Sequence, residues 1–210
     1  MARKRTFPYK PIVFLACLAP SLWLGFGMFN GMLGANPIET VLRDLGDWGL
    51  RFLLLGLAIS SVRRVLGWAW VMRYRRMIGL FAFFYAFLHL AIYVGVDHFF
   101  DWATIWKDIV KRPYITIGMG ALLCLIPLAI TSPKVMVRKI GGARWKKLHK
   151  LVYPIAIAGV VHFFLLVKAD IREPMIYAVI LAVLLGERFY RKLPLSFSSS
   201  ATRSASSSGR

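Results

Sequence analysis

Four histidines are the residues of this chain whose type and spacing are best suited to chemistry. His89 follows the apolar run MIGLFAFFYAFL, and His149 and His162 lie thirteen residues apart in the stretch WKKLHKLVYPIAIAGVVHFF. An ionisable side chain inside an apolar segment is costly and by default marks a functional site. Neutral imidazole is also a good ligand for transition metals such as iron. For any one of these histidines alone, a hydrogen bond to a neighbouring helix is an equally simple explanation.

The composition indicates that membrane-spanning helices position these histidines. The chain of 210 residues is 58% hydrophobic, whereas roughly 45–50% is usual for a soluble domain. A net charge of +19 would suggest nucleic-acid binding in a soluble protein. Here, however, the apolar runs approach the length of about 20 residues that crosses a bilayer. Six such runs occur, at 12–29, 48–65, 77–96, 114–131, 151–167 and 175–189.

The distribution of charge predicts how these spans are oriented. The segments 1–11, 63–76, 134–150 and 188–210 hold 21 of the 28 Lys and Arg residues, whereas eight of the nine Asp and Glu residues lie at the opposite ends of the spans or in the loops there. Because short cytoplasmic loops are enriched in Lys and Arg, we expect both termini in the cytoplasm. The positive charge is then a signal of topology and of anionic lipid, and nucleic-acid binding is not expected.

We therefore expect an all-α integral membrane protein, a six-transmembrane-helix bundle over residues 12–192. A basic cytoplasmic N-terminus at 1–11 precedes it. The Ser-rich segment 193–210 has almost no apolar residue to bury and is expected to be a disordered cytoplasmic tail. The sequence contains no Gly-rich phosphate-binding loop, and the spans with their short loops leave no room for a soluble catalytic domain.

Counting along the expected helices places two histidines at the same depth. His89 lies thirteen residues beyond Arg76, and His162 lies thirteen beyond His149, which is about 20 Å outwards in both cases. Two neutral imidazoles at one depth are what a six-coordinate haem iron needs, and haem is an apolar disc that packs between helices. On a regular helix His149 and His162 would lie about 140° apart, although Pro154 could bend it.

His149 lies at the inner boundary, at the level of Arg75 and Arg76. A second, inner haem could take His149 as one ligand and a non-histidine group or water as the other. The two arginines would then pair with haem propionates, for which a bidentate guanidinium is well suited. Plain anchoring of the helix at the cytoplasmic side is the alternative explanation for both arginines.

Short motifs over residues 10–192 resemble the ferric reductase-like transmembrane family, which includes the membrane half of NADPH oxidases. They are LGANP at 33–37, RRMIGL at 75–80, LH at 88–89, RPYIT at 112–116, TS at 131–132 and WKKLHKLVY at 145–153, followed by His162. Each motif is weak alone, but the ordered set is specific. The resemblance implies that His89, His149 and His162 are haem ligands. It also implies that Arg75 or Arg76 replaces a second histidine of the oxidases, so the second ligand of an inner haem stays open.

Within that family the chain is most similar to the haem-binding membrane subunits of a periplasmic methionine sulfoxide reductase system. The resemblance implies one or two b-type haems, and FMN as a second cofactor. Electrons would come from the quinol pool or a cytosolic flavin reductase and cross the bacterial inner membrane. They would reach the periplasmic molybdopterin enzyme MsrP, which repairs oxidised proteins. The chain would thus be an electron-transfer subunit without a substrate-reducing site of its own.

Two other functions remain open at this point. A transmembrane ferric or cupric reductase would share the haem but act directly on metal chelates. A small transporter would use its histidines to relay protons or only to pack. His98, in VDHFFDW at 96–102, matches no motif of the family and is expected to be an ordinary interfacial histidine.

Overall fold

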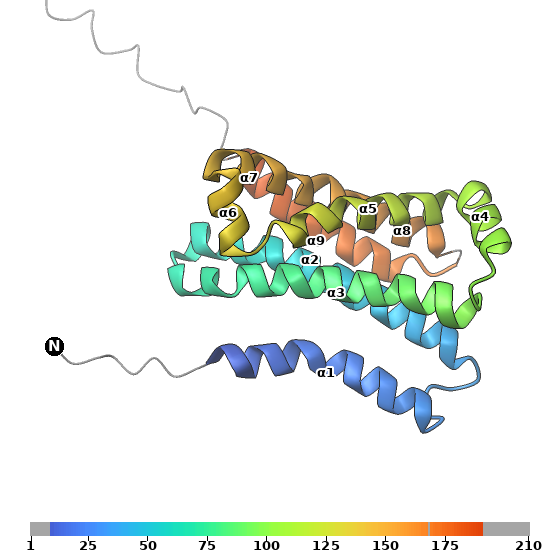
Figure 1. Cartoon of the computed structure of the whole chain (residues 1–210). Coiled ribbons are helices and arrows are strands. Elements are labelled where there is room, and N and C mark those ends of the chain that lie inside the picture. Colours follow the sequence, from blue (N-terminus) through green and yellow to red (C-terminus); the bar gives the residue numbers. More distant parts are fainter. Residues whose placement is uncertain (1–8, 168, 191–210) are drawn as a thin grey trace, which may run out of the picture.

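The computed structural model describes residues 9–167 and 169–190, and the elements formed by these residues are all helices. The long helices run side by side in one elongated bundle, and short helices lie at both of its ends (Figure 1). Five segments are long and apolar enough to cross a membrane, which confirms the expected all-α membrane class. They are α1 (Tyr9–Phe29), α2 (Pro37–Leu66), α3 (Arg75–Ile92) with the π-helical turn Tyr93–Asp97, α5 (Pro113–Ile130), and the segment Gly142–Leu166 that contains α7 (Gly142–Leu148), a 3₁₀ turn (His149–Leu151) and α8 (Val152–Leu166).

The expected sixth span lies within α9 (Arg172–Tyr190), which packs against α2 and α8. This helix is 19 residues long, but Glu173 and Arg188 place charges in its first and last turns. Together with the neighbouring Glu187, these charges explain why α9 is not among the five segments that are long and apolar enough to cross a membrane. The predicted disordered tail at 193–210 and residues 1–8 of the predicted N-terminal segment lie outside the described residues.

Helix α2 is the centre of the bundle, although its sequence is the least apolar of the five. Of its most apolar window 56% is buried inside the protein, against 17–22% in the other four segments. The helix also begins eleven residues earlier than the predicted span at 48–65. Pro37 occupies the first turn, where its missing N–H costs nothing. Asn36 caps this end by accepting the Glu39 N–H at 3.4 Å and donating to the Glu39 carboxylate at 3.0 Å.

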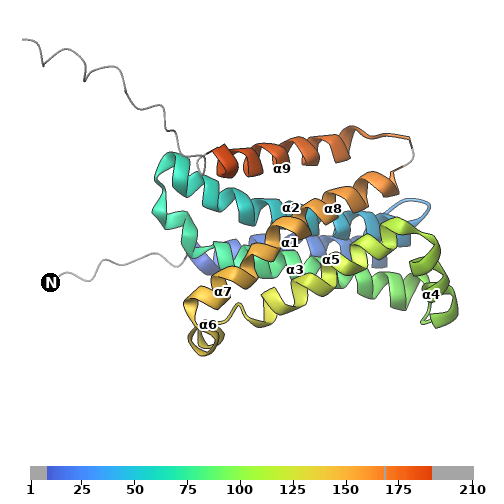
Figure 2. The same ribbon diagram turned by 90° about the horizontal axis from the view of Figure 1, so that it is seen from above.

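Two closely packed helix pairs build the interior, α2 with α3 and α5 with α8 (Figures 1 and 2). A Cβ added to Gly49 of α2 would lie 3.4 Å from the Ala86 backbone nitrogen of α3, so a glycine permits this close approach. Both α3 and α8 run from the end of the bundle that carries α6 (Lys134–Ile140) and α7 to the end that carries α4 (Trp102–Lys111). The sequence did not predict the short helices α4 and α6.

Helix α1 is attached to the bundle through the hydroxyl group of Tyr85, a side chain of α3 that is fully buried. This hydroxyl donates to the Cys17 carbonyl at 2.9 Å and accepts the Ser21 N–H at 3.0 Å. In a regular helix that N–H would bond to that carbonyl directly. The tyrosine therefore inserts its hydroxyl into the backbone ladder of α1, next to Pro20.

Replacing Tyr85 with phenylalanine is expected to loosen α1 from the bundle at a cost of about 1–3 kcal/mol, because two buried backbone groups lose their partner. Cys17, a buried residue of α1 itself, reports this change when Cys124 has been replaced by serine. Its rate of alkylation should rise in the phenylalanine variant and stay unchanged in Tyr190→Phe, whose ring is exposed. Equal Cys17 labelling in both variants would show that the hydroxyl does not hold α1.

Candidate functional site

The structure brings His89 of α3 and His162 of α8 together inside the bundle. Their ring centroids are 6.3 Å apart and their planes are nearly perpendicular, at 89°. The two helices run in the same direction, so residues at similar distances from the end that carries α6 and α7 can lie side by side. The depth estimated from the sequence thus corresponds to a real proximity of these two side chains.

Each ring is held by one backbone carbonyl. His89 Nδ1 lies 2.9 Å from the Leu42 oxygen of α2, and His162 Nδ1 lies 2.6 Å from the Tyr114 oxygen of α5. Because a carbonyl can only accept, Nδ1 of each neutral ring carries the proton and Nε2 carries the lone pair. Within the described part of the chain, neither Nε2 makes a hydrogen bond. Both imidazoles are thus oriented as metal ligands are, with the second nitrogen free.

A glycine stands four residues after each of these carbonyls, namely Gly46 and Gly118. An added Cβ would lie 3.2 Å from His89 Nδ1 at the first and 2.7 Å from His162 Nδ1 at the second. In a helix the Cβ of residue i+4 points back toward the carbonyl of residue i, so glycine leaves that oxygen accessible to a second donor. The sequence analysis missed both glycines. The i, i+4 spacing in YITIG at 114–118 was the available signal.

The two histidines line a cavity of about 970 Å³ between α2, α3, α5 and α8. Most of its lining is apolar or small, including Leu50, Leu122 and Gly159. The cavity continues to the α4 end of the bundle, where His98 and Arg112 belong to its wall. A space of this size and character is typical of a site for a large, mostly apolar cofactor.

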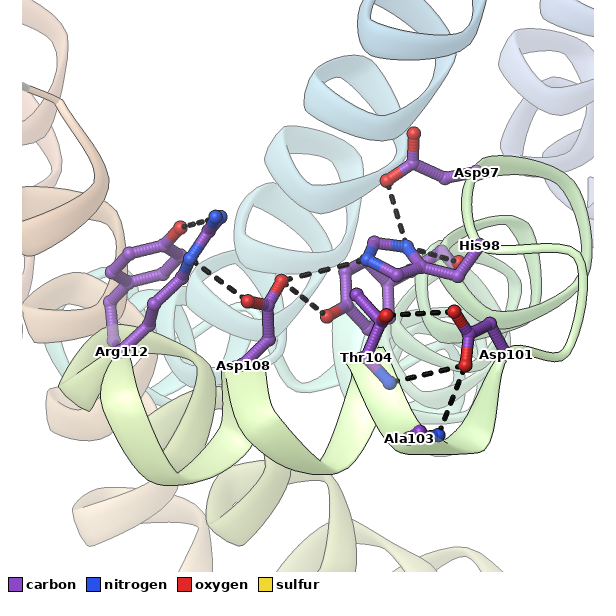
Figure 3. Close-up of polar contacts among 9 residues, drawn as sticks. Asp97, His98, Asp101, Ala103, Thr104, Asp108 and Arg112 are labelled. Atoms are coloured by element: carbon purple, nitrogen blue, oxygen red, sulfur yellow. Dashed lines mark hydrogen bonds and ion pairs between the residues drawn. The ribbon is translucent and has the colours of Figure 1, made fainter.

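A polar network closes this end of the cavity around the carboxylate of Asp108 (Figure 3). Asp108 accepts from Arg112 Nε at 3.2 Å and from the Tyr93 hydroxyl at 3.3 Å, and His98 Nε2 lies 3.5 Å away. His98 Nδ1 is 3.1 Å from Asp97, and its ring packs on Tyr93 with the centroids 4.3 Å apart. His98 is therefore held in a polar network rather than lying free at the interface.

Asp101 begins α4 beside this network. It accepts the Thr104 hydroxyl at 2.7 Å and the N–H groups of Ala103 and Thr104 at 3.1 and 3.2 Å (Figure 3). These hydrogen bonds, with that of the Thr104 side chain first, hold the pKa of the Asp101 carboxyl below its usual range. The cap fixes where α4 starts.

His149 lies apart from the histidine pair, in the 3₁₀ turn between α7 and α8. Its ring stacks on Trp145 with the centroids 4.0 Å apart, and its Nε2 lies 3.1 Å from the Thr131 hydroxyl. Trp145 in turn donates to the Thr131 carbonyl at 2.9 Å. Each residue of a 3₁₀ turn rotates further about the helix axis than an α-helical residue does. The three residues of this turn therefore reduce the angle between His149 and His162 about the axis to about 80°, compared with about 140° on a regular α-helix.

Arg75 and Arg76 start α3 at the same end of the bundle as His149. Both guanidinium groups are close enough for their charges to act on the His149 imidazole. Arg75 is half-buried, whereas Arg76 is exposed. The structure thus groups His149 with these arginines, and it does not bring them to the histidine pair.

Comparison with known proteins supports one family over most of the chain. Residues 45–160 match the family described as ferric reductase like transmembrane component. A protein-methionine-sulfoxide reductase heme-binding subunit MsrQ from Rhodospirillum rubrum is 58% identical over 176 residues, which is 84% of this chain and 85% of the relative. The subunits of the same name from Caulobacter vibrioides and Azospira oryzae are 53% and 47% identical, covering 83% and 89% of this chain and 83% and 80% of the relatives.

Proposed function

Because the chain belongs to the ferric reductase-like transmembrane family, and within it to the heme-binding MsrQ subunits, we propose that it carries electrons across the bacterial inner membrane to a periplasmic methionine sulfoxide reductase. Haem, when bound, supplies a centre that accepts and releases single electrons. The chain itself provides the ligands, their orientation and a pocket between helices. The observation that carries this proposal is the geometry of His89 and His162.

His89 and His162 are proposed as the two residues that would hold the iron of one b-type haem. Metal–imidazole bonds are about 2.0 Å long, so two imidazoles that would hold one metal between their free Nε2 atoms must lie close together. The observed separation is 6.3 Å. The Leu42 and Tyr114 carbonyls fix each ring and increase the basicity of its Nε2. The residues present therefore fit the group.

His149, Arg75 and Arg76 are proposed to serve the entry of electrons at the other end of the bundle. His149 would be a ligand of a second haem, and the arginines would hold its propionates or the phosphate of FMN. Their support is their grouping around one imidazole and the half-buried position of Arg75. Electrons would come from the quinol pool or from a cytosolic flavin reductase and leave at the α4 end to the partner, the molybdopterin enzyme MsrP.

The proposal requires six spans with both termini in the cytoplasm, so α9 must cross the membrane. A fluorescent reporter fused after Lys192 is expected to be active only in the cytoplasm, because the Lys- and Arg-rich segments all lie at that end. Alkaline phosphatase inserted at Asp101 or at Asp170 should be active, since both positions lie at the opposite end. Phosphatase activity from a fusion after Lys192 would show that α9 does not span and would reverse the proposed direction of transfer.

Replacing His149 with alanine is expected to spare the spectrum of the haem between His89 and His162, because His149 belongs to a separate group of residues. Electron delivery from a reduced quinone should nevertheless slow by tenfold or more, since the entry site is damaged. His98→Ala, which removes a histidine of the cavity wall but no proposed iron ligand, is the comparison and should also retain the haem spectrum. If His149→Ala removed all haem from a folded protein, the proposal of one haem at His89 and His162 and a second at His149 would be wrong. A single haem held by His149 would replace it.

The experiment that tests the function as a whole is spectroscopic. Protein purified from haem-replete cells should show a low-spin b-type spectrum that sharpens on reduction with dithionite. Adding the periplasmic reductase and methionine sulfoxide should then reoxidise the haem. Reoxidation by ferric chelates alone would instead support a metal reductase, and a colourless preparation would contradict the proposal.

A further inference from the structure

Arg188 of α9 is a buried cation whose donors are only partly satisfied. It is 9% exposed and lies in the last turn of α9. Nη2 donates to the Leu57 carbonyl of α2 at 2.6 Å, and the guanidinium carbon lies 5.1 Å above the Tyr153 ring. Nε and Nη1 are buried without a hydrogen-bond partner among residues 9–167 and 169–190. Unsatisfied buried donors are rare in proteins and point to a missing acceptor.

A second orphaned group lies on α2, the helix whose Leu57 carbonyl Arg188 contacts. Ser60 is one turn beyond Leu57, and its hydroxyl is also buried without a partner in the described part of the chain. Its neighbour Ser61, by contrast, donates to the Glu187 carboxylate at 3.1 Å and accepts from Arg64 at 3.0 Å. The unsatisfied donors are therefore concentrated beside a satisfied polar cluster rather than spread over the protein.

The charges of this cluster do not balance. The charges of Arg64, Arg75 and Glu187 act on Arg188. Each of the three arginines also interacts electrostatically with Tyr153. Glu187 is paired with Arg64, at 2.6 and 3.1 Å. The Glu187 carboxylate is thus engaged by Arg64, and the positive charges of Arg75 and Arg188, which act on the same group of residues, leave an excess of two.

The rest of the chain does not supply the missing negative charge. The other eight Asp and Glu residues lie in the first half of α2, around α4, and at the start of α9, all toward the opposite end of the bundle. The segments 1–8 and 191–210 and position 168 contain no Asp or Glu. A buried cation without a counter-charge is strongly unfavourable, so an external anion is the simplest compensation.

We propose that Arg188, with Arg64, Arg75 and Ser60, forms a binding site for a phosphate group. A phosphate monoester carries up to about two negative charges and three acceptor oxygens, which matches the excess charge and the orphaned donors. The phosphate comes either from an anionic lipid headgroup of the adjacent leaflet or from a nucleotide such as FMN. The site shares Arg75 with the electron-entry site and so rests on the proposed function there, but it does not depend on the haem pocket between His89 and His162.

Thermal unfolding of the whole protein tests this site. FMN and riboflavin differ only by the phosphate, and nanodiscs of phosphatidylcholine with or without phosphatidylglycerol differ only by the anionic headgroup. In the wild type we expect stabilisation by FMN but not riboflavin if the source is a nucleotide, or by phosphatidylglycerol if it is a lipid. Arg188→Gln should weaken the response by tenfold or more, whereas Arg138→Gln, which removes an exposed cation from α6 at the same end, should retain it.

The glutamine variant should itself fold, because removing an unpaired buried charge lifts a penalty from the ligand-free protein. Its melting temperature without phosphate should therefore equal or exceed that of the wild type, and the spectrum of the haem at His89 and His162 should be unchanged. The proposal fails if the wild type responds to neither FMN nor phosphatidylglycerol, or if Arg188→Gln retains the full response. It also fails if Arg188→Gln instead lowers haem content, since the acceptor would then be a haem propionate.

Discussion

Alanine in place of either His89 or His162 removes one and the same haem signal from the purified protein. Each imidazole would supply one of the two bonds proposed to hold the iron, so either change weakens haem binding at the same site or empties it. Bound haem of this site should fall at least tenfold, and electron delivery to the periplasmic reductase about a hundredfold or more. The double variant should lose little beyond either single variant, because the two side chains act as one unit.

Two measurements make this result decisive. The reduced-minus-oxidised spectrum identifies which signal is lost, and haem stoichiometry shows how much remains. His98→Ala provides the control for removing a histidine at the α4 end, and it should keep full haem content. If His89→Ala and His162→Ala eliminated different signals, the two residues would belong to two haems and the pairing would be wrong.

Gly118→Ala should be nearly as damaging as losing His162 itself, although no ligand is removed. The new methyl group would lie 2.7 Å from His162 Nδ1, a distance at which the ring must move. The ring would then lose the Tyr114 carbonyl and the orientation of its Nε2. We expect haem content to fall about tenfold or more, with the remaining iron partly five-coordinate.

Two other glycines provide the comparison. Gly120→Ala, on the same helix, adds a methyl group with no atom within 4 Å and should behave as wild type. Gly46→Ala approaches His89 Nδ1 at 3.2 Å, so its effect should be intermediate. Equal haem content in Gly118→Ala and Gly120→Ala would mean that the contact of His162 with Tyr114 does not position the ligand.

The sequence predicted the level of the histidines because a helix rises uniformly. Counting thirteen residues from Arg76 and from His149 needed only the rise per residue and the direction of each helix. The same count could not predict which carbonyl each ring would meet, since that depends on how α2 packs beside α3 and α5 beside α8. The roles of Gly46 and Gly118 are therefore visible only in three dimensions.

Charged residues were the reason why the sequence did not predict the start of α2 or the burial of Arg188. The early start of α2 was missed because Asp44, Asp47 and Arg51 lower the mean hydropathy of this part of the helix. In the structure these charges have partners, since Arg51 donates to the Tyr177 hydroxyl at 2.8 Å and lies beside Asp47. Arg188 was counted among the cations of the cytoplasmic side. Its burial against Leu57 and Tyr153 arises from contacts more than thirty residues away in sequence, which no local pattern records.

The level of His89 along α3 has a consequence for energetics. In the proposed orientation, an electron that moves from the Arg76 end to the histidine pair travels about 20 Å of a hydrocarbon core about 30 Å thick. The cytoplasmic side of an energised bacterial membrane is electrically negative, so this movement is downhill by about 1.5 kcal/mol for each 100 mV of membrane voltage. Reduction of the outer site is thus coupled to the voltage. Dissipating that voltage with an ionophore should slow the delivery of electrons even when the donor, the ligands and the partner are unchanged.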